Sequence, residues 1–452
     1  MRFEDIPTPS YVLDEKKLKQ NLEILKEVRE RSGAKILLAQ KAYSAYQTYP
    51  LIAQYLDGTT ASGIYEARLA HEEFKVPTTD RLVHGEIRKT LDENAPKPEN
   101  HVFEPAFKED ELRDLCKMCD HIVFNSLSQL EYHRPTWEKA ASEGKVSVGI
   151  RINPEISTED SHEIYDPCAP GSRLGVRNDD MPDALPKGVE GLHVHNLCEQ
   201  GFEPLEDTFL KVEREFARFF PSPLIPDDYD TFIFKEFERN MRIRDREEYD
   251  VNYGENADNT ATATPAQGEN IGKIKWINLG GGHHITRSDY DIEALIGLVS
   301  YIRAKYGIDV YLEPGEAIAL NAGYLVTTVL DVVETDRMPV LILDTSAACH
   351  MPDVLEMPYR PPLRDSEEPG EMNYTYRLSS RTCLAGDIIG DYSFNDEKKP
   401  GDRLVFEDMA IYSFVKNNTF NGMALPSISL MHEDGEVEIL RSFNYYDFKT
   451  RL

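Results

Sequence analysis

Apolar residues recur at two different spacings in the first part of this chain. Between residues 14 and 31, apolar positions from Leu18 to Val28 are three or four residues apart, and Gly33 follows the segment. This spacing predicts an amphipathic helix that ends before the glycine. The unbroken apolar run ILLA comes next, and such a run is typical of a short buried strand.

The same alternation of short apolar runs and helical segments continues to about residue 315. The apolar runs are HIVF, SVGIRIN, GLHVH, KWINL and DVYL. Short apolar strands that alternate with helices are typical of a parallel sheet covered on both faces. At this spacing they predict a (β/α)8 barrel of the TIM type over residues 12–322, rather than a doubly wound sheet.

The pattern changes near residue 323, where strand-like runs follow one another without long helices between them. We expect a C-terminal β-domain over residues 323–452, completed by residues 1–11. Residues 221–272 interrupt the barrel, and the second half of this stretch is polar, rich in small residues and without periodicity. We interpret 221–272 as a surface insertion.

Charge and composition exclude several kinds of partner. The formal net charge of −30 disfavours nucleic acids and anionic membrane surfaces. No apolar run approaches the roughly 20 residues that span a bilayer, and the N-terminus lacks a signal-peptide pattern, so we expect a cytoplasmic protein. Six cysteines in a chain of this length do not indicate a disulfide framework. Cys116 and Cys119 form a CxxC without a second pair, so we expect core thiols rather than a zinc site.

Four chemically distinctive groups follow predicted barrel strands: Lys41, the pair His193 and His195, Gly280–Gly282, and Glu313. In a parallel barrel, functional groups gather at the carboxyl ends of the strands. An apolar approach can desolvate a lysine amine and lower its pKa, and consecutive glycines let backbone amides approach a phosphate. Each group alone has a plainer alternative: an ordinary lysine, a metal-binding pair, a tight turn and a structural carboxylate.

The order of these groups along the chain resembles the fold-type III, alanine racemase-like family of pyridoxal-phosphate-dependent decarboxylases. This family includes ornithine, arginine and diaminopimelate decarboxylases. The segment RTCLAGDIIGDYSF around Cys383 and the segment EDMAIY at 407–412 resemble the part of the active site that the family's β-domain supplies. The resemblance covers nearly the whole chain apart from the insertion.

Longer blocks resemble the carboxynorspermidine/carboxyspermidine decarboxylases within that family. The blocks are PTPSYVLDE, KILLAQKAYS, YLDGTTASGIYEARLAHEEF, HNLCEQGFEPLEDT, LGGGHHITRSDYD, LDTSAACHMPDVLEMPYRP, CLAGDIIGDYSF and FNGMALPSI. They imply a role in polyamine biosynthesis, with a small carboxylated polyamine as substrate. Two features depart from this pattern: the insertion is extra, and Ile411 stands where a histidine is usual, which bears on substrate preference.

The resemblance also implies a role for each matching residue around the cofactor. Lys41 would hold pyridoxal phosphate covalently and release it to the substrate amine, and Glu313 would pair with the ring nitrogen. His193 would stack on the ring and take part in catalysis. The amides of Gly280–Gly282, with Tyr412, would bind the phosphate. No metal ion is expected.

For catalysis and substrate binding, the resemblance points to the later part of the chain. Cys383 would reach in from a second subunit and protonate the carbon that loses CO₂, which implies a homodimer with shared active sites. The distal ammonium groups of a polyamine need fixed acceptors, because burying them unpaired is costly. Glu316, Asp353 and Asp387 are the candidates, and an acid at Glu316 replaces an arginine of the related decarboxylases.

Three alternatives stay open from the sequence. The enzyme could decarboxylate another diamino or basic acid such as diaminopimelate, ornithine or arginine, or it could be an inactive regulator that keeps the fold. A metal-dependent barrel hydrolase could use His193, His195 and His283 as ligands. The sequence does not rank carboxyspermidine against carboxynorspermidine, because one methylene changes binding by only about 1–3 kcal/mol.

Overall fold

The structure is a computed structural model of the chain. It describes residues 1–76, 97–158, 165–226 and 272–452, together with two short strands at 82–83 and 86–87 and residues 228, 229 and 232. Most of the predicted insertion at 221–272 lies outside the described residues. Contacts divide the chain into two compact units, one formed by residues 1–23, 41–47 and 315–452, the other by 24–40 and 48–314.

Within the described residues, the second unit is a closed barrel of eight parallel strands. They are β2 (Lys35–Ala39), β3 (Gly58–Ala61), β6 (Glu99–Glu104), β7 (His121–Phe124), β8 (Ser147–Asn153), β10 (Val189–His193), β11 (Trp276–Asn278) and β12 (Asp309–Leu312). Neighbouring strands pair in this order, and the ring closes through the β8–β10 and β12–β2 pairs. The predicted (β/α)8 barrel is therefore confirmed.

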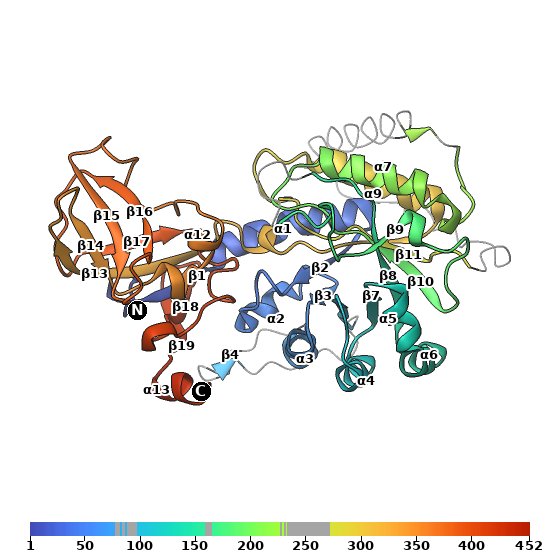
Figure 1. Cartoon of the computed structure of the whole chain (residues 1–452), viewed down its shortest axis with the longest axis horizontal. Helices are drawn as coiled ribbons and strands as arrows, with labels where there is room; N and C mark the ends of the chain where they lie inside the picture. The colour runs from blue at the N-terminus through green and yellow to red at the C-terminus, as the bar shows by residue number, and fades with distance from the viewer. Residues whose placement is uncertain are drawn as a thin grey trace. The chain divides into compact units, whose positions relative to one another are not determined.

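Helices cover the outside of the barrel. They include α2 (Tyr49–Ile52), α3 (Ile64–Glu73), α4 (Glu109–Met118), α5 (Leu127–Tyr132), α6 (Arg134–Ser142), α7 (Glu203–Glu215) and α9 (Ile292–Tyr306). Figure 1 shows α3, α4 and α6 on one side of the strands and α7 and α9 on the other. The predicted first helix is α1 (Glu15–Ser32), which buries the apolar stripe from Leu18 to Val28.

One large side chain, Trp276, fills the interior of the barrel. It packs with Leu37, Val123 and Tyr311. The neighbouring strand β10 leaves room for the indole, because a Cβ on Gly191 would lie 2.1 Å from its ring atoms. Layers of inward-pointing side chains make such a barrel a packed core rather than a pore. Functional groups are therefore confined to the two ends of the barrel.

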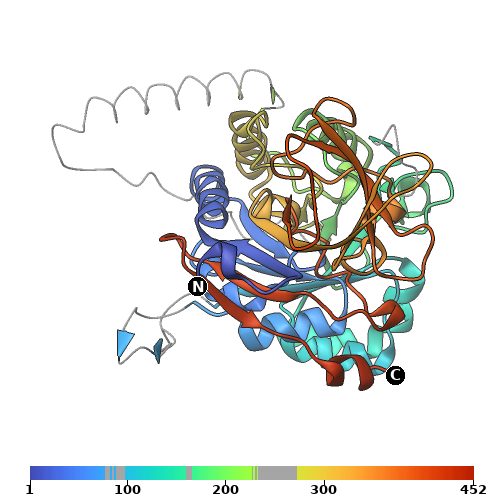
Figure 2. The ribbon, with the colours of Figure 1, turned by 90° about the vertical axis from the view of Figure 1, so that its left-hand side faces the viewer.

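The first unit contains a mixed β-sheet. Its strands are β1 (Ser10–Asp14), β13 (Gly323–Val333), β14 (Val340–Leu343), β15 (Tyr374–Ser380), β16 (Ile388–Phe394), β17 (Arg403–Glu407), β18 (Ser427–Met431) and β19 (Val437–Arg441). β1 pairs with β13 and with β18, and Figure 2 shows this blue segment beside the red strands near the C-terminus. All of β1 lies in this sheet, and residues 41–47 and 315–322 also belong to the first unit, so the division of the chain by contacts differs from 12–322 and 323–452.

Two further expectations from the sequence concern the CxxC cysteines and membrane-spanning helices. Cys116 and Cys119 are buried, in α4 and directly after it, and burial raises the pKa of both thiols. This burial agrees with core thiols. None of the helices in the described part of the chain is long and apolar enough to cross a membrane.

Candidate active site

The carboxyl ends of three adjacent barrel strands bring His193, Asn278 and Glu313 together. His193 ends β10, Asn278 ends β11, and Glu313 directly follows β12. Asn278 Nδ2 donates to Glu313 Oε1 at 2.7 Å, and His193 Nε2 lies 3.4 Å from Glu313 Oε2. All three side chains are buried. The cluster is therefore a polar centre at the catalytic end of the barrel.

The carboxyl group of Glu313 is ionised at neutral pH. Its burial alone would raise its pKa, but His193 and the hydrogen bond from Asn278 outweigh this effect and hold the pKa of Glu313 below its usual value. A buried carboxylate whose charge is kept by such neighbours can pair with a protonated ring nitrogen. The chemistry predicted for Glu313 thus agrees with its surroundings.

Steric crowding requires glycine throughout the turn Gly280–Gly282. A Cβ on Gly281 would lie 2.1 Å from Glu313 O, and one on Gly282 would lie 1.9 Å from Leu197 O; Gly280 and Gly282 also have positive φ. Gly280 N–H donates to Asn278 Oδ1, and Gly281 N–H donates to His195 Nδ1. Two of the three amides that we expected to bind phosphate are therefore engaged within the chain.

His195 lies two residues beyond His193, and the two rings occupy different surroundings. His193 is 2% exposed and packs against Phe103, whereas His195 is only partly buried. The ring centroids are 6.3 Å apart. Because Gly281 N–H donates to His195 Nδ1 at 3.0 Å, a neutral His195 carries its proton on Nε2. The more accessible of the two imidazoles is thus His195.

Two buried residues of this site were not expected from the sequence. Arg151, on β8, donates from Nη2 to His195 O at 2.7 Å, and its guanidinium lies 4.6 Å from the centre of the Phe103 ring. Burial lowers the pKa of Arg151 to about 10. The second unexpected residue is Asn278. In the sequence, Arg151 could have been noticed as a charged residue inside the apolar run SVGIRIN, and Asn278 as a polar residue directly before LGGG.

Lys41 follows the carboxyl end of β2 by two residues and is exposed. Ala39, the last residue of β2, donates its N–H to Pro314 O at 3.0 Å. Within the first unit, which contains Lys41, the N–H of Tyr412 donates to the C=O of Ala42 at 2.8 Å. The backbone of Tyr412 is therefore bound to the residue that follows Lys41, as expected if both contribute to one site.

The three predicted substrate acceptors have different surroundings. Asp387 is 1% exposed and accepts hydrogen bonds from Ser346, Ser380, Thr382 and the N–H of Ala348. These donors outweigh the effect of burial and lower the pKa of Asp387. Asp353 begins α12 (Asp353–Glu356) and lies 2.5 Å from Lys416 Nζ. Glu316 begins the short helix α10 (Glu316–Ala319).

Cys383 is exposed in the single chain. Its N–H donates to Asn421 Oδ1 at 2.6 Å. The preceding residue, Thr382, is bound to Asp387, so Asp387 holds the start of the Cys383 loop. Ile411, beside Tyr412, is buried.

The metal-site alternative with His193, His195 and His283 does not assemble in the described residues. His193 and His195 approach Glu313, with ligand atoms within 4.8 Å of one another. His283 instead contacts Tyr290 OH through Nδ1 at 2.8 Å, and burial lowers the pKa of His283 to about 3. The buried imidazole of His283 therefore contacts Tyr290 directly after the glycine turn.

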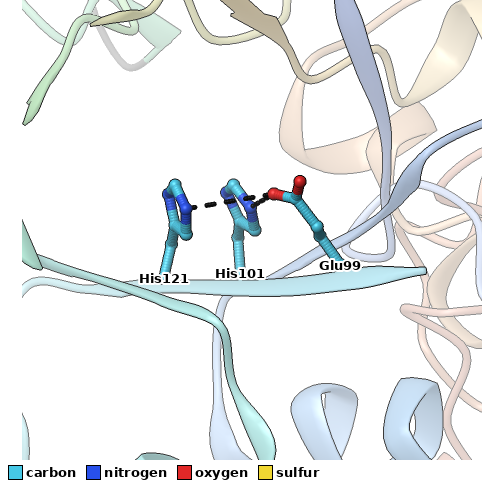
Figure 3. A group of neighbouring side chains, drawn as sticks. All are labelled: Glu99, His101 and His121. Atoms are coloured by element: carbon cyan, nitrogen blue, oxygen red, sulfur yellow. Dashed lines mark hydrogen bonds and ion pairs between the residues drawn. The ribbon is translucent and has the colours of Figure 1, made fainter. Parts of the chain in front are cut away.

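A second histidine cluster lies at the opposite, amino-terminal end of the barrel. Glu99, His101 and His121 point to one side of strands β6 and β7 (Figure 3). His101 Nε2 lies 2.8 Å from Glu99 Oε2, and Lys35 Nζ lies 2.7 Å from Glu99 Oε1. The imidazoles are stacked, with centroids 4.0 Å apart and planes at 14°. Lys35 pairs with the carboxylate of Glu99, and the stacked imidazoles fill this end of the barrel.

Replacing His121 with phenylalanine is expected to weaken the acid sensitivity of the fold. Burial and then the charge on His101 hold the pKa of His121 well below 6.5. Below pH 6.5 the unfolded chain therefore binds a proton that the folded chain does not, which costs about 1.4 kcal/mol of stability per pH unit. Phenylalanine keeps the stack but removes this proton, so the slope of unfolding free energy against pH should decrease between about pH 6.5 and 5.

The matched control is His71→Phe, because His71 is exposed on α3 of the same unit. Calorimetry at several pH values should show the wild-type slope for His71→Phe. An equal slope in His121→Phe and wild type would show that His121 does not cause the acid sensitivity.

Comparison with known proteins identifies the family. The family model described as "Pyridoxal-dependent decarboxylase, C-terminal sheet domain" matches residues 10–410. A carboxynorspermidine/carboxyspermidine decarboxylase of Campylobacter jejuni is 36% identical over the full length of both chains. A carboxyaminopropylagmatine decarboxylase of Synechocystis is 34% identical over 100% of this chain and 97% of its own length.

A solved structure shows the same relationship. The crystal structure of carboxynorspermidine decarboxylase from Campylobacter jejuni, complexed with norspermidine, has a TM-score of 0.75 at 33% identity and covers 99% of this chain and 100% of its own. These likenesses confirm the resemblance inferred from the sequence and, with it, pyridoxal phosphate as the cofactor. The chain belongs to the pyridoxal-dependent decarboxylase family.

Proposed function

We propose that this enzyme decarboxylates carboxynorspermidine, carboxyspermidine or both, and releases norspermidine or spermidine in polyamine biosynthesis. The full-length likeness to a relative with that name, at 36% identity, is the observation that carries the substrate assignment. The relative's structure with norspermidine supports the same class of ligand. The ionised Glu313 at the barrel end supports the reaction type.

The residues present fit pyridoxal phosphate. Glu313 is held in place by Asn278 and His193, so its charge faces a fixed position where a ring N–H can be paired. When bound, the cofactor supplies an electron-accepting ring for the electron pair left by departing CO₂. We propose Lys41 as its covalent anchor, and Gly282 and Tyr412 as the phosphate contacts. We propose His193, which ends β10 beside Glu313, for the face of the ring.

At the far end of the substrate, acidic side chains must meet the ammonium groups. We propose Glu316 and Asp353 for this role, since an ammonium group buried without a partner costs several kcal/mol. At Asp353 the substrate would have to replace the ammonium of Lys416. Asp387 already accepts four hydrogen bonds, so we assign it to holding the Cys383 loop rather than to the substrate.

We further propose a cytoplasmic homodimer whose active sites are shared. Cys383 would protonate the substrate carbon after CO₂ leaves, from the second subunit. The exposure of its thiol in the single chain supports this role, because a group that serves a neighbouring subunit has to lie on the surface of its own.

A second substrate has support from one observation. The Synechocystis relative, named carboxyaminopropylagmatine decarboxylase, is nearly as similar as the Campylobacter protein. An agmatine group ends in a planar guanidinium, which favours bidentate pairing with a carboxylate, whereas a spermidine chain ends in a compact ammonium. Both substrates carry the same reacting carboxylate.

The decisive experiment compares kcat/KM for carboxyspermidine, carboxynorspermidine, carboxyaminopropylagmatine, diaminopimelate, ornithine and arginine. We expect one or both carboxylated spermidines to exceed the amino acids by about 100-fold or more, equal to about 2.7 kcal/mol at 1.4 kcal/mol per tenfold. A higher value for carboxyaminopropylagmatine would move the assignment to the second substrate. A higher value for diaminopimelate would exclude both.

A further inference from the structure

Asn278 is fully buried beside Glu313, and both ends of its side chain are bound. Its Nδ2 donates to Glu313 Oε1 at 2.7 Å, and its Oδ1 accepts the N–H of Gly280 at 2.8 Å. Because a backbone N–H can only donate, Oδ1 has to face Gly280. This contact sets the orientation of the amide, so that an N–H donor faces the carboxylate of Glu313.

The same residues form a closed circuit of hydrogen bonds. Asn278 donates to the side chain of Glu313, the N–H of Glu313 donates to Gly280 O at 2.7 Å, and the N–H of Gly280 donates back to Asn278. The backbone of Asn278 is also fixed, because its O accepts the N–H of Val194 at 2.8 Å. The position of the Glu313 carboxylate and the course of the glycine turn are therefore set together.

Only an amide of this shape satisfies both neighbours. A carboxylate at position 278 would accept from Gly280 equally well, but it would place a second acid against Glu313 in a buried site. Two carboxylates at hydrogen-bond distance cannot both stay ionised, so they share a proton and titrate as a pair. The choice of asparagine over aspartate thus affects the charge of Glu313 rather than the local packing.

We propose that Asn278 is a positioning residue, which aims the carboxylate of Glu313 at the ring nitrogen of the cofactor and couples it to the glycine turn. The proposal rests on the proposed function, because it assigns Glu313 to the cofactor. It adds a residue that acts through Glu313 and does not itself touch the reacting atoms.

The test compares Asn278→Asp with wild type as purified holoenzymes. We expect kcat to fall by roughly 10- to 100-fold while KM changes by less than about threefold, because the lost interaction acts on the reaction step. We also expect the near-visible absorption of the bound cofactor to become pH-dependent, because the acid pair exchanges its proton as the pH changes. A purely structural role would not move this pH profile.

Asn100→Asp is the matched control. Asn100 is a buried asparagine of the same barrel, and its Nδ2 donates to Ala67 O and Met118 O at the amino-terminal end of β6. This variant is expected to lower thermal stability while keeping the absorption profile and kcat of the wild type. The pair therefore separates an effect on Glu313 from the general cost of a buried acid.

Asn278→Ala is the second variant, in case the aspartate variant does not fold. It removes both hydrogen bonds without adding a charge, and we expect it to bind pyridoxal phosphate about tenfold or more weakly, since two contacts that hold Glu313 are lost. Wild-type absorption, kcat and cofactor affinity in these variants would overturn the proposal. A wild-type enzyme that does not take up pyridoxal phosphate would instead overturn the proposed function itself.

Discussion

Lys41→Ala protein is expected to lose the near-visible absorption band of the holoenzyme and nearly all decarboxylase activity. An amine that holds the cofactor covalently cannot be replaced by a methyl group. Without this amine, the cofactor can neither be attached to the protein nor be transferred from it to the substrate amine. We expect kcat to fall by roughly 10³-fold or more, which is about 4 kcal/mol of barrier. Absorption spectra after incubation with pyridoxal phosphate, followed by single-turnover assays, measure both effects.

Lys35→Met is the control for this experiment, because Lys35 is at the opposite end of the same strand, β2. Its ammonium binds Glu99 and Tyr311 at the amino-terminal end of the barrel. This variant is expected to be less stable but to keep the absorption band. If Lys41→Ala retains the band and Lys35→Met loses it, the anchor has been assigned to the wrong lysine. Loss of the band in both would indicate a general folding defect.

Glu313→Gln is expected to have the second largest effect, and to change kcat rather than cofactor content. The substitution keeps the size of the side chain but removes the negative charge that we propose to pair with the ring nitrogen. The ring then withdraws electrons less strongly, so the loss of CO₂ slows. We expect a decrease of roughly 10²- to 10³-fold, the range found when one preorganised electrostatic contact is removed. Steady-state kinetics at saturating pyridoxal phosphate measure this decrease.

Glu316→Gln provides the comparison, since Glu316 lies three residues further along and is proposed to meet the distal ammonium. This variant should raise KM by roughly 10- to 100-fold, or about 1.4–2.7 kcal/mol, with kcat nearly unchanged. A kcat decrease in Glu316→Gln that matches the one in Glu313→Gln would contradict the separate roles. Unchanged KM would exclude Glu316 as an ammonium acceptor.

Local sequence patterns were sufficient to predict the barrel and its order of elements. The stripe from Leu18 to Val28 forms α1, and the apolar run before Lys41 forms β2. Hydrophobic periodicity records which side of each element is buried, and it does so independently of the rest of the fold. The functional positions at strand ends followed from the parallel arrangement, because all strands of such a barrel end on one face.

Boundaries between the two units were less predictable. Residues 12–14 form part of β1, in the sheet with β13 and β18, rather than the start of the barrel. Pairing between strands far apart in sequence decides where such a segment belongs. An apolar strand carries no local mark of the sheet it will join.

The candidate site shows the same contrast at the level of single residues. The motif LGGG indicated a turn near a phosphate, but the structure shows that Gly280 and Gly281 donate to Asn278 and His195. Similarly, Asp387 was a candidate for a substrate contact, and only the structure shows that it is buried among four hydrogen-bond donors. Hydrogen-bond partners depend on which chain segments meet, and this information is absent from a motif.

By itself the sequence determined the barrel, the family and the positions of Lys41 and Glu313, because these follow from short-range periodicity and from residues in a recognisable order. Only the tertiary structure decided that Glu313 is ionised, that Asn278 orients it, and that Arg151 is buried nearby. The physical reason is that the charge of a buried group depends on desolvation and on partners within a few ångströms. Here those partners come from β8, β10 and β11, which lie far apart in the chain and become neighbours only when the barrel closes.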